Sequence, residues 1–237
     1  MTELSSPEVA SSGVARRAAT PVAGAIAGIV FAVLFTVSMT VLRRTMGDVR
    51  HDTGAWLTGE TGFFKFGLAL VPFAGLAFLW FIAVARERLG RFEDQFFSTV
   101  FIGSGLLFLA MFFAAAATAG AIVAAAANDP AGFASSTTYA YARQAVTQIL
   151  AVYALRMAAI FQLSQASLWL RTRVMPRWMA LVTIVVALVL LFVFTQAWWV
   201  ALVFPAWVLL ISIYILVGTF RRSPAGEETR PRVGTAS

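Results

Sequence analysis

The sequence predicts an all-α fold, a polytopic membrane bundle of six transmembrane helices with both termini in the cytoplasm. The chain is 60% hydrophobic and 12% charged, whereas a soluble domain is about 45–50% apolar and about 25% charged. Its apolar residues gather in runs of about 20 residues, the length with which a helix crosses a bilayer. Arginines cluster at the ends of alternate runs, and this asymmetry predicts the orientation.

Two bulk properties limit the possible functions. The chain has no cysteine, so disulfides, thiolate metal sites and cysteine nucleophiles are excluded. The formal net charge of +7 would suggest nucleic acid in a soluble protein, but these arginines lie at the ends of apolar runs. There they set topology and contact anionic lipid headgroups. The predicted partner is therefore the lipid bilayer, with anionic headgroups at the cytoplasmic arginines, and no nucleic acid.

The chain begins with a polar stretch and then enters its first apolar run. Residues 1–20 are rich in Ser, Ala and Thr, which predicts a disordered cytoplasmic tail before a transmembrane domain over 21–220. A signal peptide over 1–43 is the competing interpretation. Its apolar part is too long and ends in two arginines instead of a cleavage site, which favours an uncleaved span over 22–42. Gly24 and Gly28 in this span have the small-xxx-small spacing that permits close helix approach.

The next three spans are predicted over 66–85, 97–126 and 139–170. Pro72 can kink the first of them. The second is long for a bilayer, and its Ala-rich part from Ala114 to Ala127 can pack tightly against neighbours or project beyond the membrane. The third is long as well.

The last two spans are predicted over 179–196 and 199–220, with almost no loop between them. A turn near Gln196, Trp198 and Trp199 leaves two segments of about 20 residues and places tryptophan at an interface. A turn at Pro205 would leave the final helix too short. Residues 221–237 are polar and charged, which predicts a second disordered cytoplasmic tail.

Orientation follows from the arginines and lysines. With the N-terminus inside, the cytoplasmic segments hold Arg16, Arg17, Arg86, Arg88, Arg91, Arg171, Arg173, Arg177, Arg221, Arg222, Arg230 and Arg232. The outer loops hold Arg43, Arg44, Arg50 and Lys65, so the first outer loop is the exception. This balance predicts that both termini lie inside. The predicted location of this multi-pass protein is the cell (plasma) membrane.

Arg156 is the most informative single residue, because it lies near the middle of an otherwise apolar predicted helix. An arginine at mid-span costs about 2.5–3.5 kcal/mol, so it normally turns inward and is partnered. No Asp or Glu lies centrally in any predicted span. Tyr141, Gln144, Gln148 and Gln162 fall on one side of the same helix at 100° per residue, with Arg156 beside them. These five residues are either a polar cavity for an anionic group or a set of structural hydrogen-bonding residues.

Two loops carry small groups of titratable residues. Asp48, His51 and Asp52 offer three ligands in the first outer loop, but one histidine and two carboxylates match no strong metal spacing. We therefore interpret them as a solvated loop with a local ion-pair cluster and predict no metal. Glu93 and Asp94 precede a helix, where acids complement its dipole.

Several membrane activities fail on missing residues. Ser104 resembles an intramembrane nucleophile, but no predicted span holds a histidine base. A single histidine excludes a bis-histidine haem, and the only lysine, Lys65, lies at a helix end instead of mid-span. The spans also lack the paired aspartates of an intramembrane protease. The sequence therefore predicts no enzyme, no catalytic residues and no cofactor.

The stretch YALRMAAIFQLSQASLWLRTRVMPRW, residues 153–178, resembles a segment of uncharacterised bacterial, many of them actinobacterial, integral membrane proteins with six spans. The resemblance covers about a tenth of the chain. It implies the same membrane topology and carries no activity.

Three functional hypotheses remain. The first is a non-catalytic component of the cell membrane, either an accessory subunit of a larger assembly or a lipid-contacting scaffold. A membrane-protein partner or a homo-oligomer is predicted as a further possible association. The second is a small transporter or permease that binds an anionic substrate or lipid headgroup at Arg156. An intramembrane enzyme is the third and has the least support.

Overall fold

The described residues form helices joined by short connections. A computed structural model describes residues 7–47, 52–59, 61–89, 95–173, 175–192 and 198–221. No strand occurs in these ranges. The long helices are α1 (Pro7–Met46), α2 (Gly62–Leu89), α3 (Gln95–Ala125), α5 (Thr137–Gln148), α6 (Leu155–Thr172), α7 (Arg177–Phe192) and α8 (Trp198–Arg221). The short ones are η1 (Ala55–Leu57), α4 (Pro130–Ala134) and the π-helix η2 (Ile149–Ala154), which joins α5 to α6.

Five of these segments are long and apolar enough to cross a membrane: Val22–Met46, Gly62–Arg86, Ser98–Ala125, Thr137–Thr172 and Trp199–Thr219. None of them contains an Asp or Glu. The chain is therefore all-helical in its described part, with several segments suited to a bilayer, as the sequence predicts. The fifth predicted span, 179–196, corresponds to α7. This helix has only 16 residues and is shorter than each of the five segments above.

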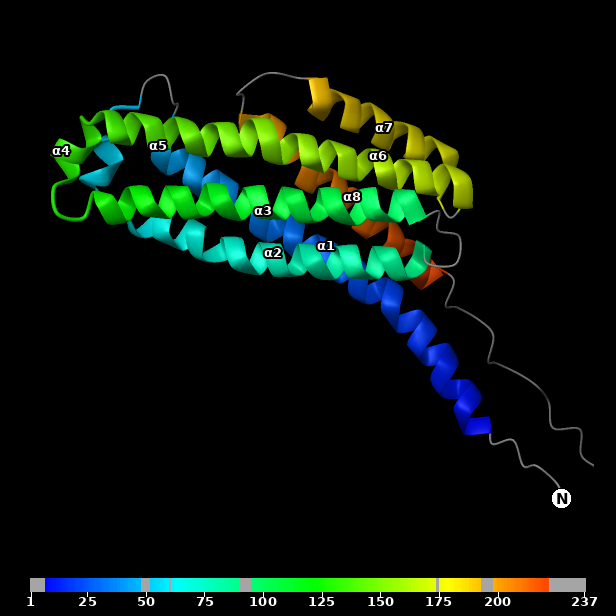
Figure 1. Ribbon diagram of the computed structural model, residues 1–237. Coiled ribbons are helices and arrows are strands. Elements are labelled where there is room, and N and C mark those ends of the chain that lie inside the picture. Colours follow the sequence, from blue (N-terminus) through cyan, green and yellow to red (C-terminus); the bar gives the residue numbers. More distant parts are fainter. Residues whose placement is uncertain are drawn as a thin grey trace, which may run out of the picture.

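One boundary differs from the prediction. Residues 7–20 belong to α1, so the helix begins well before the first predicted span and the stretch is not an irregular tail over these residues. Figure 1 shows this part of α1 projecting beyond the other helices. At the other end, α7 stops at Phe192 and α8 starts at Trp198, and the predicted turn near Gln196 lies outside the described residues. Pro205 lies inside α8, so the alternative turn there is wrong.

The long helices pack side by side in an order that the sequence did not reveal. α1 packs along α2 and α8, α3 contacts α2 and the α5–α6 segment, and α7 packs mainly on α6 (Figure 1). The order of neighbours is therefore α8, α1, α2, α3, α6 and α7. Only a few contacts join α7 to α8.

Glycines and small residues let α1 approach its neighbours closely. A Cβ on Gly24 would lie 2.5 Å from Cγ1 of Val84 in α2, and a Cβ on Gly28 would overlap the Ser212 hydroxyl of α8. The predicted close approach at these glycines is confirmed, and it joins helices of one chain. On the same helix, the Ser38 hydroxyl donates to the Gly67 carbonyl of α2 at 2.8 Å.

Candidate functional site

A buried ion pair ties the loop after α1 to α5. Arg143 in α5 donates from Nε to Oδ2 of Asp52 at 2.8 Å, and the two side chains are only 7% and 6% exposed. Nη2 of Arg143 also donates to the carbonyls of Met46 and Gly47, each at 3.1 Å. The guanidinium therefore binds both the end of α1 and the loop that follows.

Two aromatic side chains complete this cluster. The Tyr139 hydroxyl donates to the same Oδ2 of Asp52 at 2.5 Å, and Trp56 Nε1 donates to the Tyr139 hydroxyl at 3.0 Å. Tyr139 and Arg143 are four residues apart in α5, so they share one face of the helix. We call Asp52, Trp56, Tyr139 and Arg143 the loop latch.

Local backbone geometry holds Asp52 in place. Gly54 has a left-handed φ of 71°, which glycine adopts without the steric penalty of a side chain. Its amide donates to Oδ1 of Asp52 at 2.9 Å, and a Cβ on Gly54 would lie 2.6 Å from Cβ of Ala134. The same turn lets Leu57 enter the apolar contacts between Met46, Phe64 and Tyr139, so the loop closes one end of the bundle.

The environment of Asp52 favours its charged form. Burial alone raises the pKa of Asp52, but hydrogen bonds from Tyr139, Arg143 and the Gly54 amide, together with the charge of Arg143, hold it below the usual 3.8. A carboxylate whose hydrogen-bonding capacity is spent on Arg143, Tyr139 and a backbone amide serves structure in this arrangement. It is not placed as an acid or base.

The loop was predicted to be solvated with a local ion-pair cluster. Asp52 does form an ion pair, but it is buried and its partner is 91 residues away. Arg143 was not among the site residues predicted from the sequence. Its spacing from Tyr139 on one helical face was the available signal, but nothing in the sequence links that face to Asp52. Asp48 and His51 lie outside the described residues, as do Glu93 and Asp94. Within the described part, no three His, Cys, Asp or Glu side chains gather as metal ligands would.

Arg156 lies one residue after the first residue of α6, directly beyond the π-helical turn. Its Nη1 donates to the carbonyl of Val152 within that turn at 2.7 Å, and the residue is half-buried. π-helical turns are rare and are frequent at functional sites. The arginine therefore bonds back into an irregular segment of its own helix.

The predicted polar stripe is not brought together. Tyr141 is 77% exposed and Gln162 is fully buried, while Gln144 and Gln148 are half-buried. The π turn lies between Gln148 and Gln162, and each extra residue in a turn rotates the following helix by on the order of 100°. A helical wheel assumes a constant 100° per residue. Across this π turn it therefore does not predict the side of the helix on which Gln162 lies.

Other buried polar groups bond mostly within their own helices. The Ser104 hydroxyl donates to the Val100 carbonyl at 2.6 Å, the position in which serine serves the helix backbone. Trp207 Nε1 of α8 donates to the Thr183 hydroxyl of α7 at 2.9 Å. The side-chain amide of Gln162 is buried without a hydrogen bond in the described part of the chain.

Aromatic rings fill the centre of the bundle. Phe78 of α2 lies within 4.7–6.1 Å, centroid to centroid, of five other phenylalanine rings. We call the ring set the phenylalanine core; its members come from α1, α2, α3, α6 and α8: Phe31, Phe35, Phe78, Phe81, Phe101, Phe108, Phe112, Phe161 and Phe204. Phe78, Phe108, Phe161 and Phe204 are 0% exposed. The helices therefore meet around an apolar core of aromatic rings.

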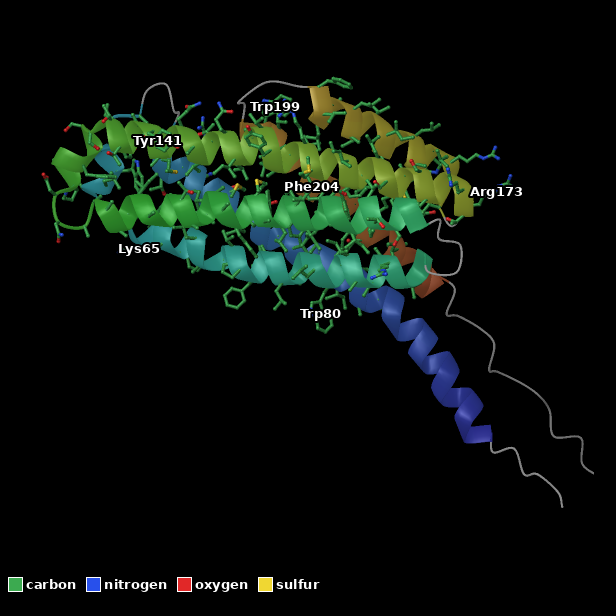
Figure 2. The ribbon with its side chains drawn as sticks, viewed as in Figure 1. Lys65, Trp80, Tyr141, Arg173, Trp199 and Phe204 are labelled. Atoms are coloured by element: carbon green, nitrogen blue, oxygen red, sulfur yellow. The ribbon has the colours of Figure 1, made fainter. Side chains whose placement is uncertain are left out.

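The outer surface also carries an apolar groove. It runs between α1 and α2, is open, and is lined by residues such as Ile26, Val30, Phe73 and Trp80. Figure 2 shows Trp80 on the outward side of α2. A surface of this kind suits lipid chains.

Comparisons with known proteins give no assignment: no protein-family model, no curated protein and no solved structure matches this chain. The resemblance of residues 153–178 to bacterial membrane proteins stays a prediction.

Proposed function

We propose that this chain is a non-catalytic accessory or scaffold component of the cell membrane. The observation that carries the proposal is the phenylalanine core. Transport or intramembrane catalysis needs polar groups that converge on a cavity or path, whereas interlocking rings hold helices in one arrangement. The buried Asp52–Arg143 pair, which fastens the loop over one end of the bundle, supports the same role.

The proposal includes a topology of six spans with both termini in the cytoplasm. The fifth span begins with α7, whose 16 residues rise about 24 Å against a hydrocarbon core of about 30 Å. Arg86, Arg171, Arg173 and Arg177 then lie on the cytoplasmic side and contact anionic headgroups. The loop latch lies on the outer side.

Cysteine labelling tests this topology. The chain has no cysteine of its own, so only an introduced cysteine in this protein can be labelled. Tyr141 is 77% exposed and Trp199 is 55% exposed, and Arg177 is exposed at the start of α7. A membrane-impermeant maleimide is expected to label Tyr141→Cys and Trp199→Cys in intact cells. Arg177→Cys is expected to react only after permeabilisation. Labelling of Trp199→Cys from the cytoplasmic side alone would contradict a crossing by α7.

The role as an accessory component is tested by purification in mild detergent from native membranes, with mass spectrometry of the proteins recovered. We expect a membrane-protein partner in stoichiometric amount. Recovery of the chain alone, or as a homo-oligomer with a bound anionic metabolite, would instead favour the second candidate function.

That second candidate is a small transporter for an anionic substrate. The π turn beside Arg156 favours it, since irregular helical turns often accompany binding sites. The phenylalanine core counts against a transporter, because its rings would have to separate before a polar substrate crossed the bundle.

A further inference from the structure

The exposed residues of α1 follow a heptad repeat. Between Val22 and Met46 the exposed side chains are Ala23, Ile26, Val30, Val33, Val37 and Arg44. Their steps of three, four and seven residues place them along one narrow line of the helix. α2 and α8 pack on α1, and this line is the face that they leave uncovered. We call these residues the α1 seam.

Aromatic side chains of α2 stand beside the α1 seam. Phe66, Phe73 and Trp80 repeat every seven residues and are all exposed. The groove between α1 and α2, which Phe73 and Trp80 line, also contains the small, half-buried side chains of Ala27 and Ala77. Small residues in a membrane helix let the backbone of another helix approach closely. The groove therefore has large walls and room for a helix between them.

The seam is as long as the hydrocarbon core is thick. From Ala23 to Arg44 the helix rises about 31 Å, against a core of about 30 Å. The acyl chains of one lipid end near the middle of the bilayer, at about half this length. Lipid chains suit any one part of this surface, but a single transmembrane helix of about 20 residues covers all of it. The Val and Ile side chains of the seam are also stiff at χ1, so they lose little freedom when a helix packs on them.

Two exposed cations lie at the outer end of the seam in the proposed topology. Arg44 continues the line of Val37. Lys65 lies about three helical turns before Leu76, which lines the groove, and Figure 2 shows Lys65 and Trp80 toward opposite ends of α2. Within the part of the chain that the structure describes, neither cation forms an ion pair. Both belong to the first outer loop, the exception to the positive-inside rule.

A second copy of this chain does not suit the charges. A dimer with its axis along the membrane normal would bring Arg44 and Lys65 of both copies together at one end, and like charges at an interface oppose binding. A carboxylate of a different protein at the same level complements both cations.

We propose that the α1 seam binds one transmembrane helix of a partner protein, and that this helix carries an Asp or Glu at its outer end against Arg44 and Lys65. The partner helix lies in the groove, between the seam and the rings of Phe66, Phe73 and Trp80. The proposal rests on the proposed accessory function and assigns it a partner surface.

Site-specific photo-crosslinking in native membranes tests the seam. Benzoylphenylalanine replaces Val30 or Val33 in the full chain, and Val185 is the matched control, an exposed valine of α7, which packs mainly on α6. Mass spectrometry then sequences the crosslinked peptides. Both seam positions are expected to crosslink to one apolar segment of about 20 residues in the same partner chain, at sites about three or four residues apart. That segment is expected to end in an Asp or Glu on the outer side, and the control is expected to crosslink to lipid.

A charge reversal supplies a second readout. Arg44→Glu together with Lys65→Glu is expected to lower the crosslinking yield at Val30 and Val33 about ten-fold. Replacement of the partner's acidic residue by Lys is expected to restore the yield. Both cations are exposed, so the circular dichroism of the double variant is expected to match that of the wild type.

Other results overturn the proposal. Phospholipid adducts alone at Val30 and Val33 would make this face a lipid surface, and crosslinks to a second copy would make it an interface between copies. A yield that the charge reversal leaves unchanged would contradict a partner helix held by Arg44 and Lys65. A stoichiometric partner in the purification, with only lipid adducts at the seam, would leave the accessory function standing without this site. Recovery of the chain alone would instead count against the function itself.

Discussion

Asp52→Ala is expected to lower the free energy of unfolding in detergent by about 3–5 kcal/mol, the usual cost of removing one partner from a buried ion pair. The substitution leaves the charge of Arg143 buried with only the carbonyls of Met46 and Gly47 to bind. It also removes the acceptor for the Tyr139 hydroxyl. A titration with sodium dodecyl sulfate, followed by circular dichroism, measures the change.

A double-mutant cycle separates the ion pair from general damage. Arg143→Leu added to Asp52→Ala is expected to cost less than the sum of the single changes, since the second substitution removes the uncompensated charge. Arg44→Gln, at an exposed arginine near the same loop, is the matched control and is expected to stay within about 0.5 kcal/mol of the wild type. Additive losses for Asp52 and Arg143 would contradict a coupled pair.

The same pair gives a pH dependence with a definite sign. The folded-state pKa of Asp52 lies below its ordinary 3.8, so its ionised form is the one that stabilises the fold. This stabilisation is fully present above about pH 5 and is lost as the pH falls below about 4 and through the folded pKa. The difference between wild type and Asp52→Ala is therefore expected to shrink on acidification. A difference that grew on acidification would contradict this assignment.

Phe78→Ala is expected to destabilise the bundle by about 3 kcal/mol. Phe78 is 0% exposed and touches rings from α1, α3, α6 and α8, so the cavity would lie where most of the helices meet. Lipid tails are as apolar as this core, so most of the loss comes from missing ring contacts. The midpoint of thermal aggregation in detergent and the unfolding titration both measure it.

Two controls define this effect. Phe73→Ala changes the same residue type on the same helix, but Phe73 is 63% exposed, and the loss is expected to be below about 0.5 kcal/mol. Phe78→Leu keeps most of the volume and is expected to cost less than about 1.5 kcal/mol. Equal losses at Phe73 and Phe78 would show that the phenylalanine core does not hold the helices together.

Some features of the candidate site were predictable from the sequence, and others were not. Arg156 stood out from the sequence because a charge within an apolar run is conspicuous. Its bond to the Val152 carbonyl was not predictable, since that depends on the π turn that precedes it. Gln162 could not be placed in the polar stripe from the sequence, because a π turn changes the rotational phase of the helix. The short apolar sequence ILAVYA carries no pattern that distinguishes a π turn from an α turn.

The sequence by itself determined the all-helical class and the presence of several apolar segments. These properties are local: a run of about 20 apolar residues buries no charge, and backbone hydrogen bonds in a helix close within the run. Only the tertiary structure decided the order of neighbours, the meeting of Gly28 with Ser212, the phenylalanine core and the pairing of Asp52 with Arg143. Each of these joins residues that are far apart in the chain, and their contacts depend on how whole helices pack, which hydropathy does not encode.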